Sequence, residues 1–208
     1  MSCGKKDVKI ASQDKINKEY YKIMREFDNE NYNLALQSFE KFTKQYSVNP
    51  IAKQSLQMEI FLQYVAEKYK ESIALSDMYI KLYAIDNIGV EYAHYMTIMG
   101  MYKGIKDVDA GVDVALQLAG YIGNNLPKIK NEDYRSDISW RLQKIYLFIT
   151  ISKIIAGDTY FNANQYISAM IQYQEAIKMY QKIGDTKLIT INEIQNRVNA
   201  INKIIGIE

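Results

Sequence analysis

The sequence predicts an all-α protein, a solenoid of about five helix-turn-helix repeats. Apolar residues recur at a spacing of three and four, which places them on one face of an α-helix. One such stripe returns several times along the chain, and only two prolines and ten glycines interrupt its 208 residues. With 48% hydrophobic and 24% charged residues, the chain has the composition of a packed globular protein and not of a disordered one.

The repeating unit is clearest in residues 17–47. A first helix carries apolar residues from Ile16 to Phe27, and the polar segment DNEN at 28–31 separates it from a second helix. The second helix carries the stripe Tyr32, Ala35, Phe39, Phe42 and Tyr46, which returns 37 residues later as Tyr69, Ser72, Ser76, Tyr79 and Tyr83, then as Tyr166, Ala169, Tyr173, Ala176 and Tyr180, and more weakly as Val108, Gly111, Ala115, Leu118 and Ile122. One amphipathic stripe could arise by chance, but three copies in phase argue against it. The pattern resembles the tetratricopeptide (TPR) repeat, whose period is about 34 residues.

The other predicted elements follow in order. The second repeat pairs a helix through residues 56–64 with one at 71–83, and the third pairs 90–103 with 111–122. The polar segment 123–133 is the expected hinge, or the edge of a partner site. A long helix from Ser136 and a helix at 165–182 form the fourth repeat; residues 186–205 are the first helix of a fifth repeat or a cap. Trp140 is expected to pack between the third and fourth repeats.

Composition argues against several functions. The net charge is +2 and no basic patch is interleaved with aromatic residues, so we expect no nucleic-acid partner. The longest apolar run, residues 145–151, is far shorter than the about 20 residues that span a bilayer. No apolar segment follows Met1, so no signal peptide is visible.

No set of residues indicates catalysis or a resident metal. The segment from Asp107 to Asp113 imitates a calcium loop, but Gly111 falls one place early and Leu118 replaces the bidentate glutamate. His94, the only histidine, has no second ligand nearby in the sequence and is expected to pack. No phosphate-binding loop or Ser/His/Asp set is present. We therefore expect no catalytic residue, no metal ligand and no enzymatic activity.

Cys3 is the only cysteine, so no internal disulfide can form. It could be an incidental thiol, a nucleophile, or the acylated cysteine with which a bacterial lipoprotein begins. Small Ser2 before it and the polar residues after it fit the last case, and nothing nearby would lower the pKa of a nucleophilic thiol. The expected organisation is a lipidated tether at 1–13 and a TPR solenoid at 14–208, with halves 14–122 and 132–208.

The order of residues resembles the BamD (ComL) family, the TPR lipoproteins of the outer-membrane β-barrel assembly machinery. The first repeat, KEYYKIMREFDNENYNLALQSFEKFTKQYS, looks like that family's opening repeat without gaps. The stretch VEYAHYMTIMGMY is similar to its third repeat. The segment SDISWRLQKIYLFITISKIIAGDTYFNANQYISAMIQYQEAI is similar to its fourth, with an Arg-Leu start at Arg141 and Leu142 and a long helix that ends in Tyr160 and Phe161. Ser47 departs from the family, which tends to have proline there, and the family usually has one helix more after the last.

The resemblance implies a non-enzymatic scaffold at the outer membrane that faces the periplasm, anchored through a covalent lipid on Cys3 and needing no other cofactor. Its implied partners are the last POTRA domain of the barrel subunit BamA, other Bam lipoproteins and unfolded β-barrel precursors. The membrane is contacted through the lipid anchor alone. Two alternatives stay open: another envelope TPR lipoprotein, serving pilus or cell-envelope assembly, and a cytosolic adaptor or enzyme in which Cys3 is incidental.

The first helices of TPR repeats line a groove that holds an extended peptide or a partner helix. Aromatic rings would supply apolar contacts there, and amides would bond the peptide backbone. Tyr20 and Phe61 could instead be core residues. The groove positions carried over from the repeat are Asn17, Tyr20, Met24, Phe27, Gln54, Gln57, Phe61 and Tyr64.

Overall fold

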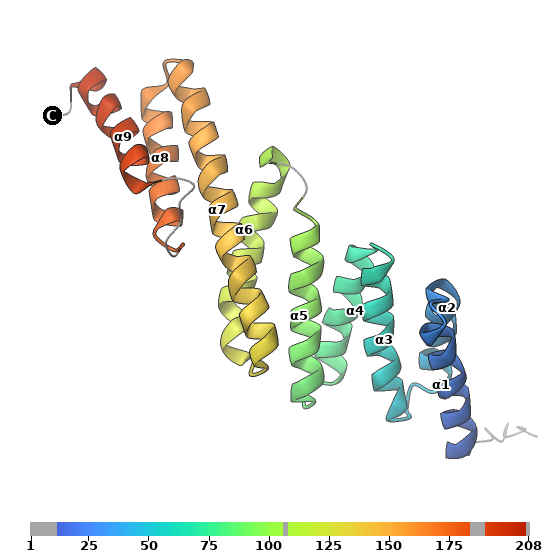
Figure 1. The fold of residues 1–208 in the computed structure, drawn as a ribbon. Helices are drawn as coiled ribbons and strands as arrows, with labels where there is room; N and C mark the ends of the chain where they lie inside the picture. The colour runs from blue at the N-terminus through green and yellow to red at the C-terminus, as the bar shows by residue number, and fades with distance from the viewer. Residues whose placement is uncertain (1–11, 106–107, 184–189, 207–208) are drawn as a thin grey trace, which may run out of the picture. The chain divides into compact units, whose positions relative to one another are not determined.

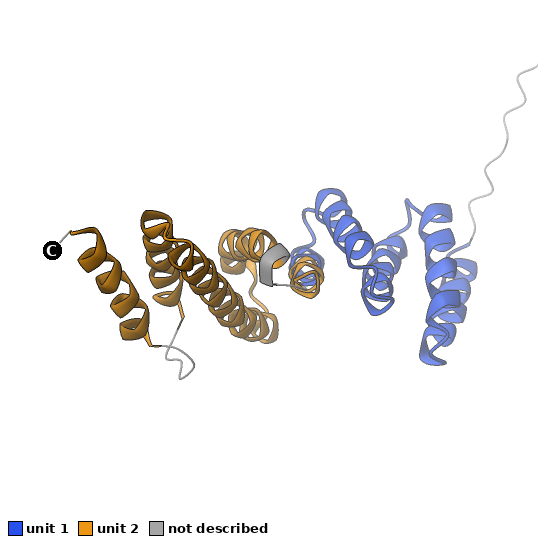
Figure 2. Ribbon diagram, turned by 90° about the horizontal axis from the view of Figure 1, so that it is seen from above, with its two compact units in different colours: residues 1–96 blue, residues 97–208 orange. Residues whose placement is uncertain are grey.

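The computed structural model describes residues 12–105, 108–183 and 190–206. Within these ranges it contains nine α-helices, one short 3₁₀ turn and no strand (Figure 1). Neighbouring helices pack in chain order, so the prediction of an all-α, TPR-like solenoid is confirmed. The chain divides into two compact units, residues 1–96 and 97–208 (Figure 2), and each is described by itself.

Unit 1 is built from α1 (Gln13–Asp28), α2 (Tyr32–Gln45), α3 (Ile51–Val65), α4 (Tyr69–Leu82) and the first part of α5 (Asn87–Lys103). Each of the first three helices packs on the next one along the chain. The stripe predicted from the sequence forms the core: the buried members are Ala35, Phe39, Phe42 and Tyr46 in the first repeat, and Ser72, Ser76 and Tyr79 in the second.

The turns inside the helix pairs share one backbone conformation. Glu30 lies between α1 and α2 with φ of 62°, and Glu67 lies between α3 and α4 with φ of 59°. Asn164 occupies the same place in the fourth repeat with φ of 61°. Left-handed backbone in a residue other than glycine is uncommon. Its return at the same point of three helix pairs supports the repeat assignment independently of the apolar stripe.

Unit 2 contains the rest of α5, then α6 (Val108–Asn125), η1 (Leu126–Lys128), α7 (Glu132–Asn162), α8 (Tyr166–Tyr180) and α9 (Ile191–Ile205). The long helix of the fourth repeat is confirmed, since α7 has 31 residues. Thr190 and Glu193 form a capping box at the start of α9. The buried stripe residues of unit 2 are Ala115, Leu118 and Ile122 on α6, Ala169, Tyr173 and Ala176 on α8, and Ile194, Val198 and Ile201 on α9.

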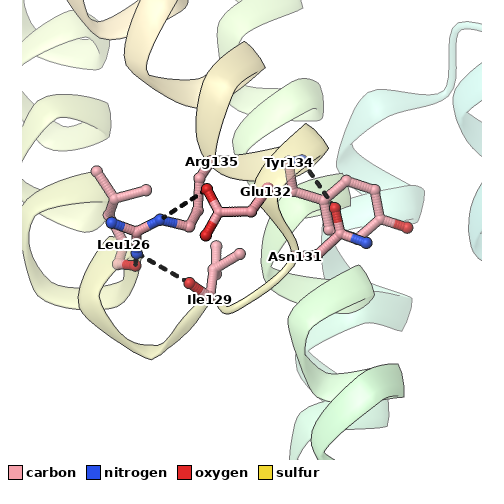
Figure 3. Close-up of polar contacts among 6 residues, drawn as sticks. All are labelled: Leu126, Ile129, Asn131, Glu132, Tyr134 and Arg135. Atoms are coloured by element: carbon pink, nitrogen blue, oxygen red, sulfur yellow. Dashed lines mark hydrogen bonds and ion pairs between the residues drawn. The ribbon is translucent and has the colours of Figure 1, made fainter.

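The segment 123–133, expected as a polar hinge or the edge of a partner site, is mostly helical. Helix α6 continues to Asn125, η1 follows at once, and only residues 129–131 lie outside a helix. Ile129 is fully buried, and Nη1 of Arg135 donates to the carbonyl oxygens of Leu126 at 3.2 Å and Ile129 at 3.0 Å (Figure 3). Oδ1 of Asn131 accepts from the backbone N–H of Tyr134 at 3.0 Å and caps α7. These bonds fasten the connection to α7, the helix that follows it.

Trp140 is also placed differently from the expectation. Its side chain is 54% exposed on α7, while Ile138 and Ile145 supply the buried face of that helix. Two cations lie near its ring: Nζ of Lys144 is 5.4 Å and Cζ of Arg141 is 5.8 Å from the ring centroid. Cations at this range are attracted to the face of an indole, so the ring is stabilised at the surface and not between repeats.

Candidate functional site

The predicted groove residues lie on α1 and α3 of unit 1. Tyr20 is half-buried, with its ring centroid 5.8 Å from that of Phe39 and 5.9 Å from that of Phe42. Burial, with a smaller contribution from Tyr21, raises the pKa of the Tyr20 hydroxyl above its usual value. The hydroxyl therefore stays neutral at physiological pH and can donate one hydrogen bond.

A second aromatic contact joins the two groove helices. The ring of Phe27 on α1 lies 6.0 Å from that of Phe61 on α3, and both rings are partly buried against the core of the first repeat. Met24 is partly buried against the same core. These three side chains and Tyr20 therefore serve the core with one side and keep part of their surface open, which fits both interpretations of the sequence.

The remaining groove residues differ in how open they are. Gln54 is exposed, and Asn17 is half-buried with its Oδ1 accepting from Nε2 of Gln13 at 2.8 Å. Nε2 of Gln57 donates to the hydroxyl of Tyr79 at 3.0 Å, so this amide already has a partner within the fold. Tyr64 packs its ring 5.5 Å from that of Tyr69. Asn17 and Gln54 are thus better placed than Gln57 to bond a peptide backbone.

Between α2 and α3 lies a buried acidic residue that the sequence patterns did not reveal. Glu59 on α3 is 5% exposed and accepts a hydrogen bond from Thr43 on α2. Burial raises the pKa of Glu59 to about 7, the hydrogen bond from Thr43 opposes this shift, and nearby Glu40 adds to it. The sequence feature that could have revealed Glu59 is a carboxylate next to Ile60, on the part of α3 that faces the core.

A second polar network joins α3, α4 and the start of α5. The buried Tyr79 donates to Oδ2 of Asp86, and Nζ of Lys53 lies 3.1 Å from the same oxygen. The hydrogen bond from Tyr79 holds the pKa of Asp86 below its usual value, and Lys53 lowers it further. Tyr79 belongs to the predicted stripe, but its partners come from α3 and from the connection between α4 and α5, and could not be paired with it from spacing alone.

Unit 2 presents a different surface on α8. Ile167 is 65% exposed and Ile171 is 47% exposed, one helical turn apart on the same face. Opposite them, Tyr173 is buried and donates to Oδ1 of Asp158 at 2.6 Å, while Nε of Arg197 on α9 lies 3.1 Å from that oxygen. The helix is thus fixed on its inner side and leaves an aliphatic strip uncovered on its outer side.

The expected anchor, Cys3, lies outside the described residues, as does Asp107 of the calcium-like segment. Where side chains are described, no three His, Cys, Asp or Glu residues gather as a metal site would require. In the same part of the chain, no helix combines the length and apolar character needed to cross a bilayer.

Comparison with known families matches residues 12–205 to the YfiO family, described as outer membrane lipoprotein. The match covers both units of the fold. The chain belongs to this family. Curated relatives of the chain carry the name BamD. The resemblance to the BamD family derived from the sequence is therefore confirmed.

Two curated relatives of this YfiO chain are named outer membrane protein assembly factor BamD. The protein from Rickettsia prowazekii (strain Madrid E) is 23% identical over 154 residues, which cover 74% of this chain and 61% of the relative. The protein from Caulobacter vibrioides (strain ATCC 19089 / CIP 103742 / CB 15) is 21% identical over 159 residues, which cover 76% of this chain and 52% of the relative. The chain thus spans between half and two thirds of the length of these relatives.

Proposed function

We propose that this protein is an outer-membrane protein assembly factor, a lipid-anchored periplasmic TPR scaffold with no catalytic role. The observation that carries the proposal is the family match over residues 12–205, together with two relatives named as BamD assembly factors. In this proposal Cys3 carries the lipid, unit 1 receives unfolded β-barrel precursors, and unit 2 docks on the last POTRA domain of BamA. Other Bam lipoproteins complete the assembly.

The aliphatic strip on α8 is the proposed docking surface for BamA. Introducing two carboxylates by Ile167→Glu with Ile171→Glu is expected to weaken binding to the periplasmic domains of BamA at least about tenfold, since a charge buried without a partner is strongly unfavourable. Both positions are open to solvent, so the variant should fold. Binding is measured by pull-down and by titration with the BamA domains from the same source.

A matched control adds the same two charges elsewhere on unit 2. Gln117→Glu with Gln143→Glu changes exposed positions on α6 and α7 and should leave the affinity for BamA unchanged. If neither variant lowers the affinity, the docking surface lies elsewhere. If the parent protein does not bind BamA at all, the partner is wrong, and the alternative of another envelope lipoprotein gains support.

The proposed groove on α1 and α3 is tested separately with a peptide. The probe is the fluorescently labelled C-terminal strand of an outer-membrane barrel protein from the same organism. Asn17→Ala with Gln54→Ala removes two amides and is expected to weaken peptide binding about thirtyfold, at about 1 kcal/mol for each lost hydrogen bond.

The control for the groove is Asn33→Ala with Gln37→Ala. It removes the same two side-chain types from exposed positions on α2, outside the proposed groove. For this control, fluorescence anisotropy should give the same peptide affinity as for the parent protein. Equal losses in the two double variants would place the peptide somewhere other than the groove on α1 and α3.

A further inference from the structure

One edge of unit 1 exposes aliphatic side chains at the connections between its repeats. Val48, between α2 and α3, is 98% exposed. Around the connection from α4 to α5, Leu82 is 64%, Ile85 is 96% and Ile88 is 83% exposed. These four residues are called the aliphatic edge. Aliphatic groups left this open gain little from the fold itself, and several of them at one edge form a candidate interaction surface.

Two polar contacts connect the aliphatic edge to the start of the first helix and to the next repeat. Nδ2 of Asn49, the residue after Val48, donates to Oε1 of Gln13 at 2.9 Å, and Gln13 is the first residue of α1. Nζ of Lys53 lies 3.1 Å from Oδ2 of Asp86, the residue after Ile85. In Figure 1 these connections and the start of α1 lie at the same ends of the unit 1 helices. The chain therefore enters unit 1 at the aliphatic edge.

The connection that bears Ile85 and Ile88 is held in one conformation. Asp86, between them, accepts from the buried Tyr79 and pairs with Lys53. Gly89 leaves room for this arrangement, because a Cβ there would lie only 2.6 Å from Cζ of Tyr79. With Asp86 engaged on the protein side, its aliphatic neighbours are the groups presented to solvent.

The opposite edge of unit 1 has a different character. Its turns consist of residues 29–31 and 66–68, in which exposed Asn, Glu and Lys side chains predominate. The large aliphatic groups nearest to them, Leu34 and Val65, belong to helices and are 50% and 39% exposed. The two edges of unit 1 therefore differ in the side chains that they expose.

We infer that the aliphatic edge rests on the phospholipid surface of the membrane. The inference depends on the proposed lipid at Cys3, because Gln13 lies ten positions after Cys3 and a chain of that length spans at most about 35 Å. A lipid there keeps the start of α1, and the aliphatic edge beside it, close to the bilayer. Four aliphatic groups bind a membrane weakly by themselves, but a short tether supplies them at a high effective concentration.

The test attaches the full chain to vesicles through its only cysteine. Cys3 is coupled to a maleimide lipid in vesicles of phosphatidylethanolamine and phosphatidylglycerol, with or without a brominated phosphatidylcholine. The single native tryptophan is removed by Trp140→Phe, and Ile85→Trp places a reporter on the aliphatic edge. We expect the brominated lipid to quench this reporter at least about twofold, as for a side chain at the boundary of headgroups and acyl chains.

The matched control is Lys68→Trp in the same background, which places the reporter at the exposed turn on the opposite edge. The brominated lipid should quench the Lys68→Trp reporter little. In the Ile85→Trp protein, the additional changes Val48→Ser and Ile88→Ser should weaken the quenching. Equal quenching at both edges, or none at Ile85→Trp when flotation shows complete coupling, would overturn the inference. The inference is also overturned if the reporter at position 85 is not quenched and Ile85→Asp abolishes binding to BamA, because the aliphatic edge would then bind protein.

This experiment is separable from the proposed function. Coupling supplies the anchor chemically, so the quenching result does not depend on native acylation of Cys3 or on any protein partner. Mass spectrometry of Cys3 from native membranes tests the anchor itself, and an unmodified thiol there would overturn the lipoprotein assignment while leaving the measured lipid contact in place.

Discussion

Replacing Gly157 with alanine is expected to destabilise unit 2 by about 2 kcal/mol. Gly157 is buried on α7 under the ring of Tyr173, and a Cβ there would lie 2.6 Å from Cδ1 and 3.0 Å from Cζ of that ring. The ring cannot easily withdraw, because its hydroxyl is bonded to Asp158, one residue along α7. Overpacking of this kind costs about 3 kcal/mol, and the better helix propensity of alanine offsets about 1 kcal/mol.

Gly120→Ala is the matched control for this prediction. Gly120 is an exposed helical glycine in unit 2, and apart from its chain neighbours and the surrounding helix backbone no atom lies within 4 Å of the position that its Cβ would take. The change is therefore expected to stabilise unit 2 by about 0.5 to 1 kcal/mol. Denaturant unfolding, with amide exchange of α7 and α8 as a local probe, gives both values. A stabilising effect of Gly157→Ala would mean that α7 and α8 lie further apart than the structure places them.

Most of the fold could be predicted because each TPR helix has to bury one stripe. Ala35, Phe39 and Tyr173 occupy the predicted positions and are at most 2% exposed. The spacing of such residues is a property of a single helix, so the sequence contains it directly. The length of α7 was predictable for the same reason, since its apolar pattern continues without a break.

The connections and the surface were harder to predict, because they depend on contacts between segments. The mostly polar segment 123–133 contains a buried residue, Ile129, whose carbonyl oxygen accepts a hydrogen bond from Arg135 of the following helix. Trp140 is a large apolar residue and was expected inside, yet α7 already has enough aliphatic residues for its buried face. Neither outcome follows from the composition of the segment itself.

The candidate groove could be predicted only as a set of positions. The repeat pattern placed Tyr20 and Phe61 on the correct helices but did not decide between core and ligand contact, and the structure gives each a buried and an open side. The partner of the Gln57 amide, Tyr79, lies 22 residues away on the next helix. Pairings of this kind require the packed structure, because sequence periodicity contains no information about which helices face each other.

Buried Glu59 predicts that unit 1 loses stability as the pH rises. Its pKa is about 7 in the folded protein against a usual value of 4.5, so the fold favours the protonated carboxyl. Below pH 4.5 the group is protonated in both the folded and the unfolded states, and its contribution to the free energy of unfolding is fully present. As the pH rises through 7, the buried carboxyl must ionise, and about 3 kcal/mol of unfolding free energy is lost.

Glu59→Gln should remove this pH dependence. The amide cannot ionise, and its oxygen can still accept from Thr43, so the variant is expected to match the parent near pH 4.5 and to exceed its stability by about 3 kcal/mol near pH 8. Denaturant midpoints measured across this range, with tryptophan-independent circular dichroism, test the prediction. Glu71→Gln changes an exposed carboxylate of α4 and should follow the parent at every pH.

The charges around Glu59 sharpen this test. Glu40 raises the pKa of Glu59 and Lys44 lowers it, both from α2, the helix that carries Thr43. Glu40→Gln should therefore shift the stability loss to lower pH values, while Lys44→Gln should shift it to higher pH values. If the difference between Glu59→Gln and the parent is the same at pH values near 5 and 8, then Glu59 is already ionised in the folded protein and water must reach it between α2 and α3.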